Sequence, residues 1–230
     1  MAVIWKGTPN YSVGRRGYRP EAIVIHIMAG TLTGTDAWFA NPASQVSAHY
    51  GIGKNGEMHQ YVKEEDTAQH AGVVDKPSWT LIKPGINPNL YTVGLEHEGQ
   101  PTDVWTQAMK AASAETIRAV AQRWQIPIDR NHIVGHYQIR ASKPNCPAVD
   151  KRIIDELIAL AAPVVLMYPL IRKQGDEDVY YVKDGRRYHI GNFVTFELGR
   201  DRLWSDAIQE VSAQQFSTIP KGGELVLAYE

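Results

Sequence analysis

Apolar residues along most of the chain alternate between short continuous runs and helical periodicities. Residues 23–27 form an uninterrupted, largely β-branched run bracketed by Pro20 and Gly30, which predicts a buried strand. Between Trp105 and Trp124, apolar side chains recur at three- and four-residue steps, which predicts an amphipathic helix. Strands that alternate with helices in this way indicate an α/β fold, with a mixed central β-sheet flanked by helices.

The same reasoning predicts the remaining elements of this larger part. We expect strands at 48–53, 57–62, 92–96 and within 126–134, and helices at 35–39 and 149–160. Asn55-Gly56 predicts a hairpin in which both turn residues have positive φ. Residues 73–90 are rich in proline and predict a long surface loop, which in a compact domain is often functional.

The character of the sequence changes around residues 161–163. Beyond this point we expect a hairpin over 179–190 around Asp184-Gly185, helical pieces near 193–198 and 212–219, and an end strand over 225–229. The sequence therefore predicts a domain over 1–162 and a small C-terminal α+β module over 163–230, near the lower size limit for independent folding.

Composition excludes several classes of protein. The 230 residues contain 24 Lys and Arg against 25 Asp and Glu, so we expect no nucleic-acid partner of the polybasic kind. No apolar run has the length of a membrane span, so we expect no membrane insertion. The first residues are too few and too polar for a signal peptide, which predicts a protein that is cytoplasmic at synthesis. A single cysteine excludes an intramolecular disulfide.

Three potential metal ligands lie at predicted strand ends and in a loop. They are His26, His136 and Cys146. Two histidines and one cysteine form a known catalytic zinc set that leaves one tetrahedral position open. Their wide spacing does not by itself distinguish such a site from two core histidines and a buried thiol.

Five ordered blocks of sequence add a resemblance to this picture. The chain resembles the type-2 N-acetylmuramoyl-L-alanine amidases, the zinc amidase family that includes peptidoglycan recognition proteins and many phage endolysins. The similar blocks lie within residues 20–160, at 23–27, 46–56, 69–72, 89–96 and 133–147.

The resemblance implies a fold, a reaction and roles for individual residues. His26, His136 and Cys146 match the positions of the family's zinc ligands, and Glu96 matches the acidic residue beside the metal. The implied substrate is bacterial peptidoglycan, cut at the amide between N-acetylmuramic acid and L-alanine. Zinc would activate water, and Glu96 would transfer its proton.

Three further positions carry expectations about the substrate. Lys143 resembles the family's lysine near the scissile carbonyl, but two residues separate it from Cys146 where the family usually has one, so Arg140 is an alternative. His70 resembles a position near the substrate groove. His49 and Tyr50 point to opposite strand faces, so one at most can face the site; we assign Tyr50 to substrate binding and His49 to orienting a ligand.

Two other functions remain open at this point. One is a non-enzymatic peptidoglycan-binding protein of the same fold. The other is a Cys/His peptidase, in which a helix beginning at Pro147 lowers the pKa of the Cys146 thiol and His136 acts as base.

The expected biology follows from the predicted architecture. A cytoplasmic amidase with an extra module fits a phage endolysin released through a holin pore, and a muropeptide-recycling amidase is the alternative. The C-terminal module would bind cell wall through Tyr180, Tyr181, Tyr188, Arg186 and Arg187, unless these tyrosines cover its own core.

Overall fold

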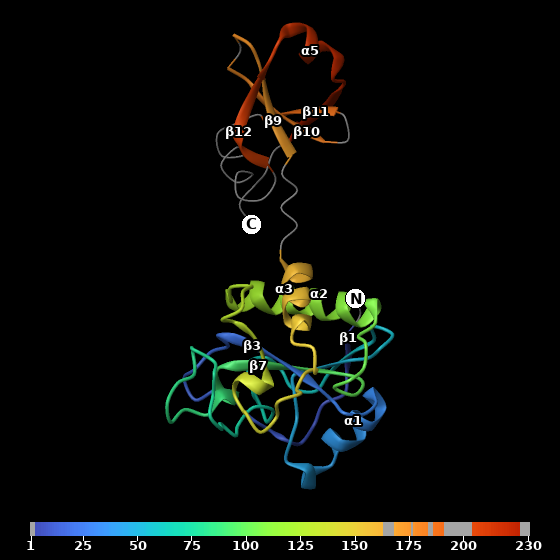
Figure 1. Ribbon diagram of the computed structural model, residues 1–230, viewed down its shortest axis with the longest axis vertical. Coiled ribbons are helices and arrows are strands. Elements are labelled where there is room, and N and C mark those ends of the chain that lie inside the picture. The colour runs from blue at the N-terminus through green and yellow to red at the C-terminus, as the bar shows by residue number, and fades with distance from the viewer. Residues whose placement is uncertain (1–2, 163–167, 176, 184–185, 191–203, 226–230) are drawn as a thin grey trace. The chain divides into compact units, whose positions relative to one another are not determined.

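The computed structural model divides the chain into two compact units, Met1–Ala162 and Pro163–Glu230 (Figure 1). It describes residues 3–162, 168–175, 177–183, 186–190 and 204–225. The division falls at the change in sequence character. Each unit has its own sheet and its own hydrophobic core.

The first unit is built on a six-stranded mixed sheet with the order β1-β5-β4-β7-β3-β8. Only the β4–β5 pair is antiparallel among these neighbours. Its strands are β1 (Val3–Trp5), β3 (Ala22–Ile27), β4 (Tyr50–Ile52), β5 (Met58–Gln60), β7 (Thr92–His97) and β8 (Ile133–Gly135). A separate two-stranded sheet pairs β2 (Tyr11–Ser12) with β6 (Thr67–Ala68). The expected mixed α/β sheet is confirmed.

Helices cover both faces of this sheet. The α-helices are α1 (Leu32–Ala40), α2 (Gln107–Trp124) and α3 (Arg152–Ala161), and the short 3-10 helices are η1 (Pro42–Ser44), η2 (Pro88–Leu90) and η3 (His136–Gln138). Figure 1 shows α2 and α3 together on one side of the sheet and α1 on the other. Thr106 caps α2 by accepting a hydrogen bond from the backbone N–H of Met109, which is why this helix begins at Gln107.

Strand β3 explains how the core and the candidate site share one element. Side chains alternate between the two faces of a strand. Ile23, Ile25 and Ile27 pack in the main core under α2 and α3. Val24 packs in a second core on the opposite face. By the same alternation, His26 lies on the face of Val24. The continuous apolar run therefore places one histidine on the side of the sheet away from α2 and α3.

Several predicted elements differ from those observed. Asn55-Gly56 does join an antiparallel pair, but only Gly56 of the two has positive φ, at 84°. The strand expected within 126–134 is limited to Ile133–Gly135. The helix that follows Pro147 is α3, and it begins only at Arg152, so Pro147 is not its first residue. Strands β1, β2 and β6 are too short, and β1 too exposed, for their apolar pattern to predict them.

The second unit contains a five-stranded sheet with the order β12-β9-β10-β11-β13. Its elements are β9 (Tyr168–Lys173), β10 (Val179–Lys183), β11 (Arg186–Ile190), β12 (Trp204–Val211), α5 (Ala213–Thr218) and β13 (Lys221–Leu225). The expected antiparallel hairpin is present as β10 and β11, and its turn residues lie outside the described part of the chain. The helical piece near 193–198 and the end of the strand expected over 225–229 also lie outside it.

Some side chains proposed for wall binding are part of this unit's own packing. Tyr181 is buried with Leu170 and Ile190, and its ring stacks on Tyr188. Arg187 is also buried, with its guanidinium 4.1 Å from the Phe216 ring centroid. For Tyr181 the alternative left open above therefore holds, since this side chain covers the unit's own core, and Arg187 is buried as well.

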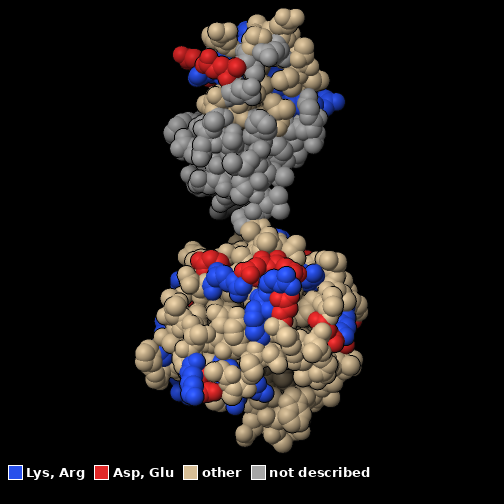
Figure 2. Space-filling model, in the orientation of Figure 1, with Lys and Arg blue, Asp and Glu red and all other residues tan. Residues whose placement is uncertain are grey.

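Surface charge is mixed rather than concentrated. On the face of the first unit in Figure 2, basic and acidic side chains lie interspersed. Ion pairs such as Lys110–Glu156 and Arg130–Asp155 account for part of this mixture. Among the described residues, no helix is both long and apolar enough to cross a membrane.

Candidate metal centre and active site

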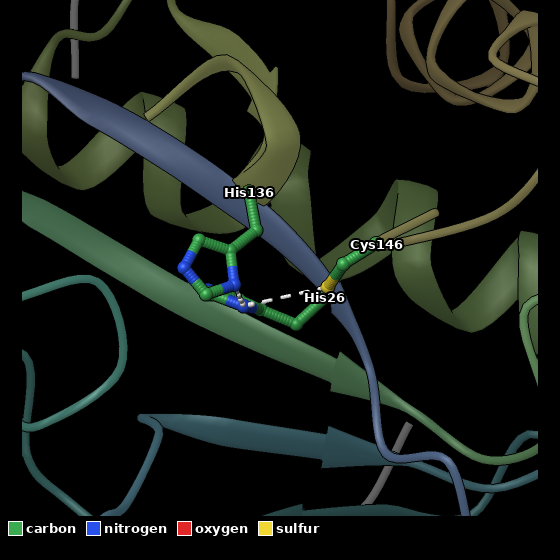
Figure 3. A group of neighbouring side chains, drawn as sticks. All are labelled: His26, His136 and Cys146. Carbon is green, nitrogen blue, oxygen red and sulfur yellow. Dashed lines mark hydrogen bonds between the residues drawn. The ribbon is translucent and has the colours of Figure 1, made fainter. Parts of the chain in front are cut away.

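Three side chains from separate elements converge at one edge of the sheet. His26 lies near the carboxyl end of β3, His136 is the first residue of η3 directly after β8, and Cys146 lies in the loop before α3 (Figure 3). Because β3 and β8 are parallel neighbours, their carboxyl ends meet at the same edge. The loop that follows η3 then returns Cys146 to both histidines.

The geometry of these three groups suits a tetrahedral cation. Their ligand atoms all lie within 4.8 Å of one another. The two Nδ1 atoms of His26 and His136 are 3.1 Å apart, and Cys146 Sγ is 4.0 Å from His26 Nδ1. Tetrahedral zinc would hold two nitrogen ligands about 3.3 Å apart and a nitrogen and a sulfur about 3.6 Å apart. Imidazole and thiolate are also ligands that zinc prefers.

Without a bound metal, burial favours the uncharged forms of these three groups. Desolvation lowers the pKa of His26 well below its ordinary value, and it lowers that of His136 to about 4. Burial raises the pKa of the Cys146 thiol to about 12, and the nearby Glu96 carboxylate adds to this shift. The lowered thiol pKa expected from a helix at Pro147 is therefore wrong. Neutral imidazoles with free lone pairs are the form that binds a metal.

Glu96 lies beside this cluster because of strand register. It is the register partner of His26 in the parallel β3–β7 pair, so both side chains leave the same face of the sheet. Glu96 Oε1 is 4.0 Å from His26 Nδ1. Among the described residues, buried Oε2 has no hydrogen-bond partner. Burial raises the pKa of Glu96 to about 8, and the charge of Lys143 opposes the shift.

A cavity of about 400 Å³ opens beside the cluster. His26, His136, Cys146 and Glu96 form part of its lining. Lys143 also lines it, whereas Arg140 does not, and Arg140 Nε donates to Ser142 Oγ. The extra residue between Lys143 and Cys146 thus leaves Lys143 at the cavity.

The two residues assigned to substrate binding lie in different places. His70 lines the cavity, and its Nδ1 is 3.0 Å from His26 Nε2. Tyr50 is buried in the main core, where its hydroxyl donates to Glu64 Oε1 over 2.6 Å. Tyr50 is therefore not part of the cavity lining, and its assignment to the substrate site is corrected. The alternation of β4 places His49 on the face shared with the site.

His49 contacts the site through other residues. Its Nδ1 accepts a hydrogen bond from the backbone N–H of Gly94, and its ring lies 5.6 Å from that of His70. Among the described residues, His49 forms no hydrogen bond to His26, His136 or Cys146, so it supports the strand and His70 rather than a ligand directly.

Several cavity residues were not predicted from the sequence. Trp38, Phe39 and Val46 contribute apolar side chains to the lining of the cavity. Trp38 is 54% exposed although it is a large aromatic residue. Trp38 lies in the short helix predicted at 35–39, and five residues are too few for a periodicity that would mark it as exposed.

Comparison with known proteins agrees with this geometry. The profile of the family described as N-acetylmuramoyl-L-alanine amidase matches residues 16–149. The chain belongs to the N-acetylmuramoyl-L-alanine amidase family. The matched segment contains all three metal-ligand candidates together with Glu96 and Lys143.

Individual relatives extend the comparison. The amidase is 34% identical to N-acetylmuramoyl-L-alanine amidase A of Achromobacter lyticus, over 52% of this chain and 62% of that protein. The match therefore spans less than two thirds of that relative. The chain is also 27% identical to the 1,6-anhydro-N-acetylmuramyl-L-alanine amidase AmpD of Citrobacter freundii, over 61% of this chain and 80% of that protein. Endolysin PlyTW of Staphylococcus phage Twort is 23% identical over 56% of this chain and 27% of that protein.

Solved structures show the same fold. A selenomethionine derivative of AmpD superimposes with a TM-score of 0.54 at 25% identity, covering 67% of the amidase and 93% of that chain. The catalytic domain of XlyA gives a TM-score of 0.53 at 17% identity, over 70% of the amidase and 100% of that chain. The type-2 amidase fold expected from the sequence is confirmed.

Proposed function

We propose that the protein is a zinc-dependent amidase that cuts the amide bond between N-acetylmuramic acid and L-alanine in peptidoglycan. The observation that carries this proposal is the convergence of His26, His136 and Cys146 at the edge of a cavity, with Glu96 beside them. The Achromobacter and Citrobacter relatives, which are both named as amidases of this bond, support the choice of bond.

The chain's own groups would hold the metal and divide the work of hydrolysis. A bound zinc would supply Lewis-acid chemistry by polarising the amide carbonyl and making water more acidic. A bound cation would lower the pKa of Glu96 from about 8 and so favour its ionised form. In that form Glu96 would accept a proton from the attacking water and return it to the leaving amine nitrogen. Its unpaired Oε2 is the oxygen free to do so.

Lys143 is the residue best placed to stabilise the developing oxyanion. It lines the cavity on the same side as Cys146, and its positive charge acts on both Glu96 and His136. A cation aimed at developing negative charge lowers the barrier to acyl transfer. Arg140 acts on His136 as well, but it is not part of the cavity lining.

The apolar part of the cavity lining suits the substrate's apolar surfaces. Trp38, Phe39 and Val46 present aromatic and aliphatic groups there. Sugar rings and lactyl methyl groups bury apolar area against such side chains, and aromatic rings provide much of it. These residues would hold the muramoyl portion while Glu96 and Lys143 act on the amide.

The competing functions are less well supported. A binding protein without activity has no need for Glu96 beside three intact metal-ligand candidates. A cysteine peptidase needs a thiolate, and burial disfavours that form at Cys146 in the absence of a metal.

For the biological role we propose a phage endolysin that is cytoplasmic at synthesis and reaches the wall through a holin pore. The second unit, with its separate sheet, is the feature that favours this role, as a wall-binding module. The resemblance to AmpD proteins supports a muropeptide-recycling amidase as the second candidate. The two differ in substrate, which is polymeric wall for the first and soluble 1,6-anhydro-muropeptide for the second.

The test is hydrolysis of purified peptidoglycan and of a soluble 1,6-anhydro-muropeptide, with mass analysis of the products. The proposal predicts release of peptides with a free L-alanine amino terminus, and faster turnover of the polymer. Cleavage within the peptide stem would contradict the amidase assignment. A strong preference for the soluble substrate would replace the endolysin role by the recycling role.

A further inference from the structure

A chain of hydrogen bonds runs from the backbone of η2 to the metal-ligand candidate on β3. Thr92 Oγ1 lies 2.7 Å from the Pro88 carbonyl oxygen and 3.2 Å from His70 Nε2. His70 Nδ1 lies 3.0 Å from His26 Nε2. We infer that Thr92 and His70 are positioning residues that fix the tautomer of His26, so that its Nδ1 is the nitrogen presented to the metal.

The direction of this chain follows from counting protons. The Pro88 carbonyl oxygen can only accept, so the single hydroxyl proton of Thr92 is donated to it. Thr92 Oγ1 can then only accept from His70, which places the proton of the neutral His70 ring on Nε2. His70 Nδ1 is left as an acceptor, and the donor facing it is the Nε2–H of His26.

The consequence at His26 is a free lone pair on Nδ1. That atom faces His136 Nδ1 at 3.1 Å and Cys146 Sγ at 4.0 Å, which is the cluster described above. The opposite tautomer would place a proton on Nδ1 in the middle of this cluster. A bond to the second ring nitrogen of a histidine ligand generally sets its tautomer and orientation.

Two further features hold His70 in place. Asn89 Oδ1 accepts hydrogen bonds from the backbone N–H groups of His70 and Ala71, at 3.1 and 2.7 Å. Gly94 leaves space for the imidazole, since a Cβ on Gly94 would lie 2.6 Å from His70 Cγ and Nδ1. The glycine in β7 is therefore required by the close approach of this ring.

This inference rests on the proposed function, because it requires a zinc site. It gives His70 the role of orienting His26, the zinc-ligand candidate, instead of the role of binding substrate. The test measures the zinc affinity of the full chain by competition with a chromogenic chelator, independently of activity. His70→Leu removes the acceptor, and we expect zinc binding about 10–100-fold weaker. His70→Asn keeps an oxygen acceptor where Nδ1 lies, and we expect affinity within about threefold of the unaltered protein.

Matched variants separate positioning from a loss of folding. Thr92→Val should weaken zinc binding more than Thr92→Ser, which keeps the hydroxyl. His132→Leu is the control, because that ring bonds Asp129 at 2.7 Å and is outside the cavity lining. Thermal unfolding of each metal-free variant shows whether the fold is retained.

The outcomes are distinct. Equal zinc affinity in His70→Leu and the unaltered protein would overturn the inference while leaving the proposed function intact. Absence of zinc binding by the unaltered protein would overturn both. Nitrogen-15 NMR of the histidine rings gives an independent result, since a proton on Nδ1 of His26 would contradict the chain of hydrogen bonds whatever the metal affinity.

Discussion

At the scale of single residues, Glu96 combines burial, a raised pKa and an oxygen without a partner. Its Oε2 is buried, and the charge of Lys143 is the main influence that opposes the effect of burial on its pKa. An unpaired buried carboxylate oxygen costs stability, so its retention points to function. Its position opposite His26 in the strand register places it next to the metal-ligand candidates without making it one of them.

Replacing Glu96 by Gln tests its role in proton transfer. Gln keeps the volume but cannot take a proton, so we expect kcat to fall about 10²–10⁴-fold. Zinc content, measured by metal analysis, should be unchanged, because the three ligand candidates are intact. If kcat stayed near that of the unaltered protein, the proton would be carried by another group.

A pair of substitutions distinguishes the two candidate cations. We expect Lys143→Met to lower kcat about 10²–10³-fold, the effect of losing one group that stabilises an oxyanion. Arg140→Met should have a much smaller effect, because Arg140 is not part of the cavity lining. If steady-state kinetics showed the larger fall in kcat for Arg140→Met, Arg140 would be the residue that stabilises the oxyanion.

The sequence allowed much of this site to be predicted, but not all. The resemblance to the amidase family indicated His26, His136, Cys146 and Glu96, and the first, second and fourth of these lie at or next to the ends of predicted strands. Tyr50 could not be placed by alternation alone, because alternation says that His49 and Tyr50 face opposite ways without saying which faces the site. The fold decides, since Tyr50 finds its partner in Glu64.

At the scale of elements, Glu64 joins the sheet to the end of α2. Its carboxylate accepts hydrogen bonds from Tyr50 on β4, from Trp124 at the end of α2 and from Arg123, its ion-pair partner. Burial alone would raise the pKa of Glu64, but the Arg123, Tyr50 and Trp124 hydrogen bonds lower it below its ordinary value. The charged form of Glu64 therefore stabilises the folded state.

Glu64→Gln tests this link through the pH dependence of stability. At neutral pH we expect the free energy of unfolding to fall by about 1.5–3 kcal/mol, the range for hydrogen bonds to a charged group. Because the folded-state pKa lies below the unfolded one, this contribution is fully present above the unfolded pKa and is lost as the pH falls through the folded value. Urea unfolding at several pH values should show the two proteins converging in acid, and a constant difference would contradict the account.

Elements with strong periodicity were predicted well, and short ones were not. The helix at Gln107–Trp124 lies within the predicted 105–124 because eighteen residues give a clear apolar face. Strand β1 has three exposed residues and is held by parallel pairing with β5, which no local pattern reveals. The helix expected at 149–160 is present as α3, and only its start differs, because the residues from Pro147 to Lys151 are not helical.

At the scale of the whole molecule, the amidase unit contains every residue that the proposed reaction requires. The ligand candidates, Glu96, Lys143 and the cavity all lie within Met1–Ala162, which has its own core. The second unit has a separate sheet and a small core of Leu170, Tyr181 and Ile190. Catalysis and wall attachment are therefore expected to be separable.

Deletion of residues 163–230 tests that separation. We expect the truncated chain to hydrolyse soluble muropeptide as fast as the full chain, because the site is intact. Its retention on sedimented cell walls should fall, because the proposed binding module is gone. Equal sedimentation of the two chains with walls would show that the second unit has another role.

The most direct test of the central claim compares metal dependence with thiol dependence at Cys146. The account predicts that a strong chelator abolishes peptidoglycan hydrolysis and that zinc restores it. Cys146→Asp, which keeps a metal ligand without a thiol, should retain measurable zinc-dependent activity, whereas Cys146→Ala should lose zinc and activity together. Hydrolysis that survives chelation but is lost in Cys146→Asp would contradict the zinc amidase and identify the thiol as the nucleophile.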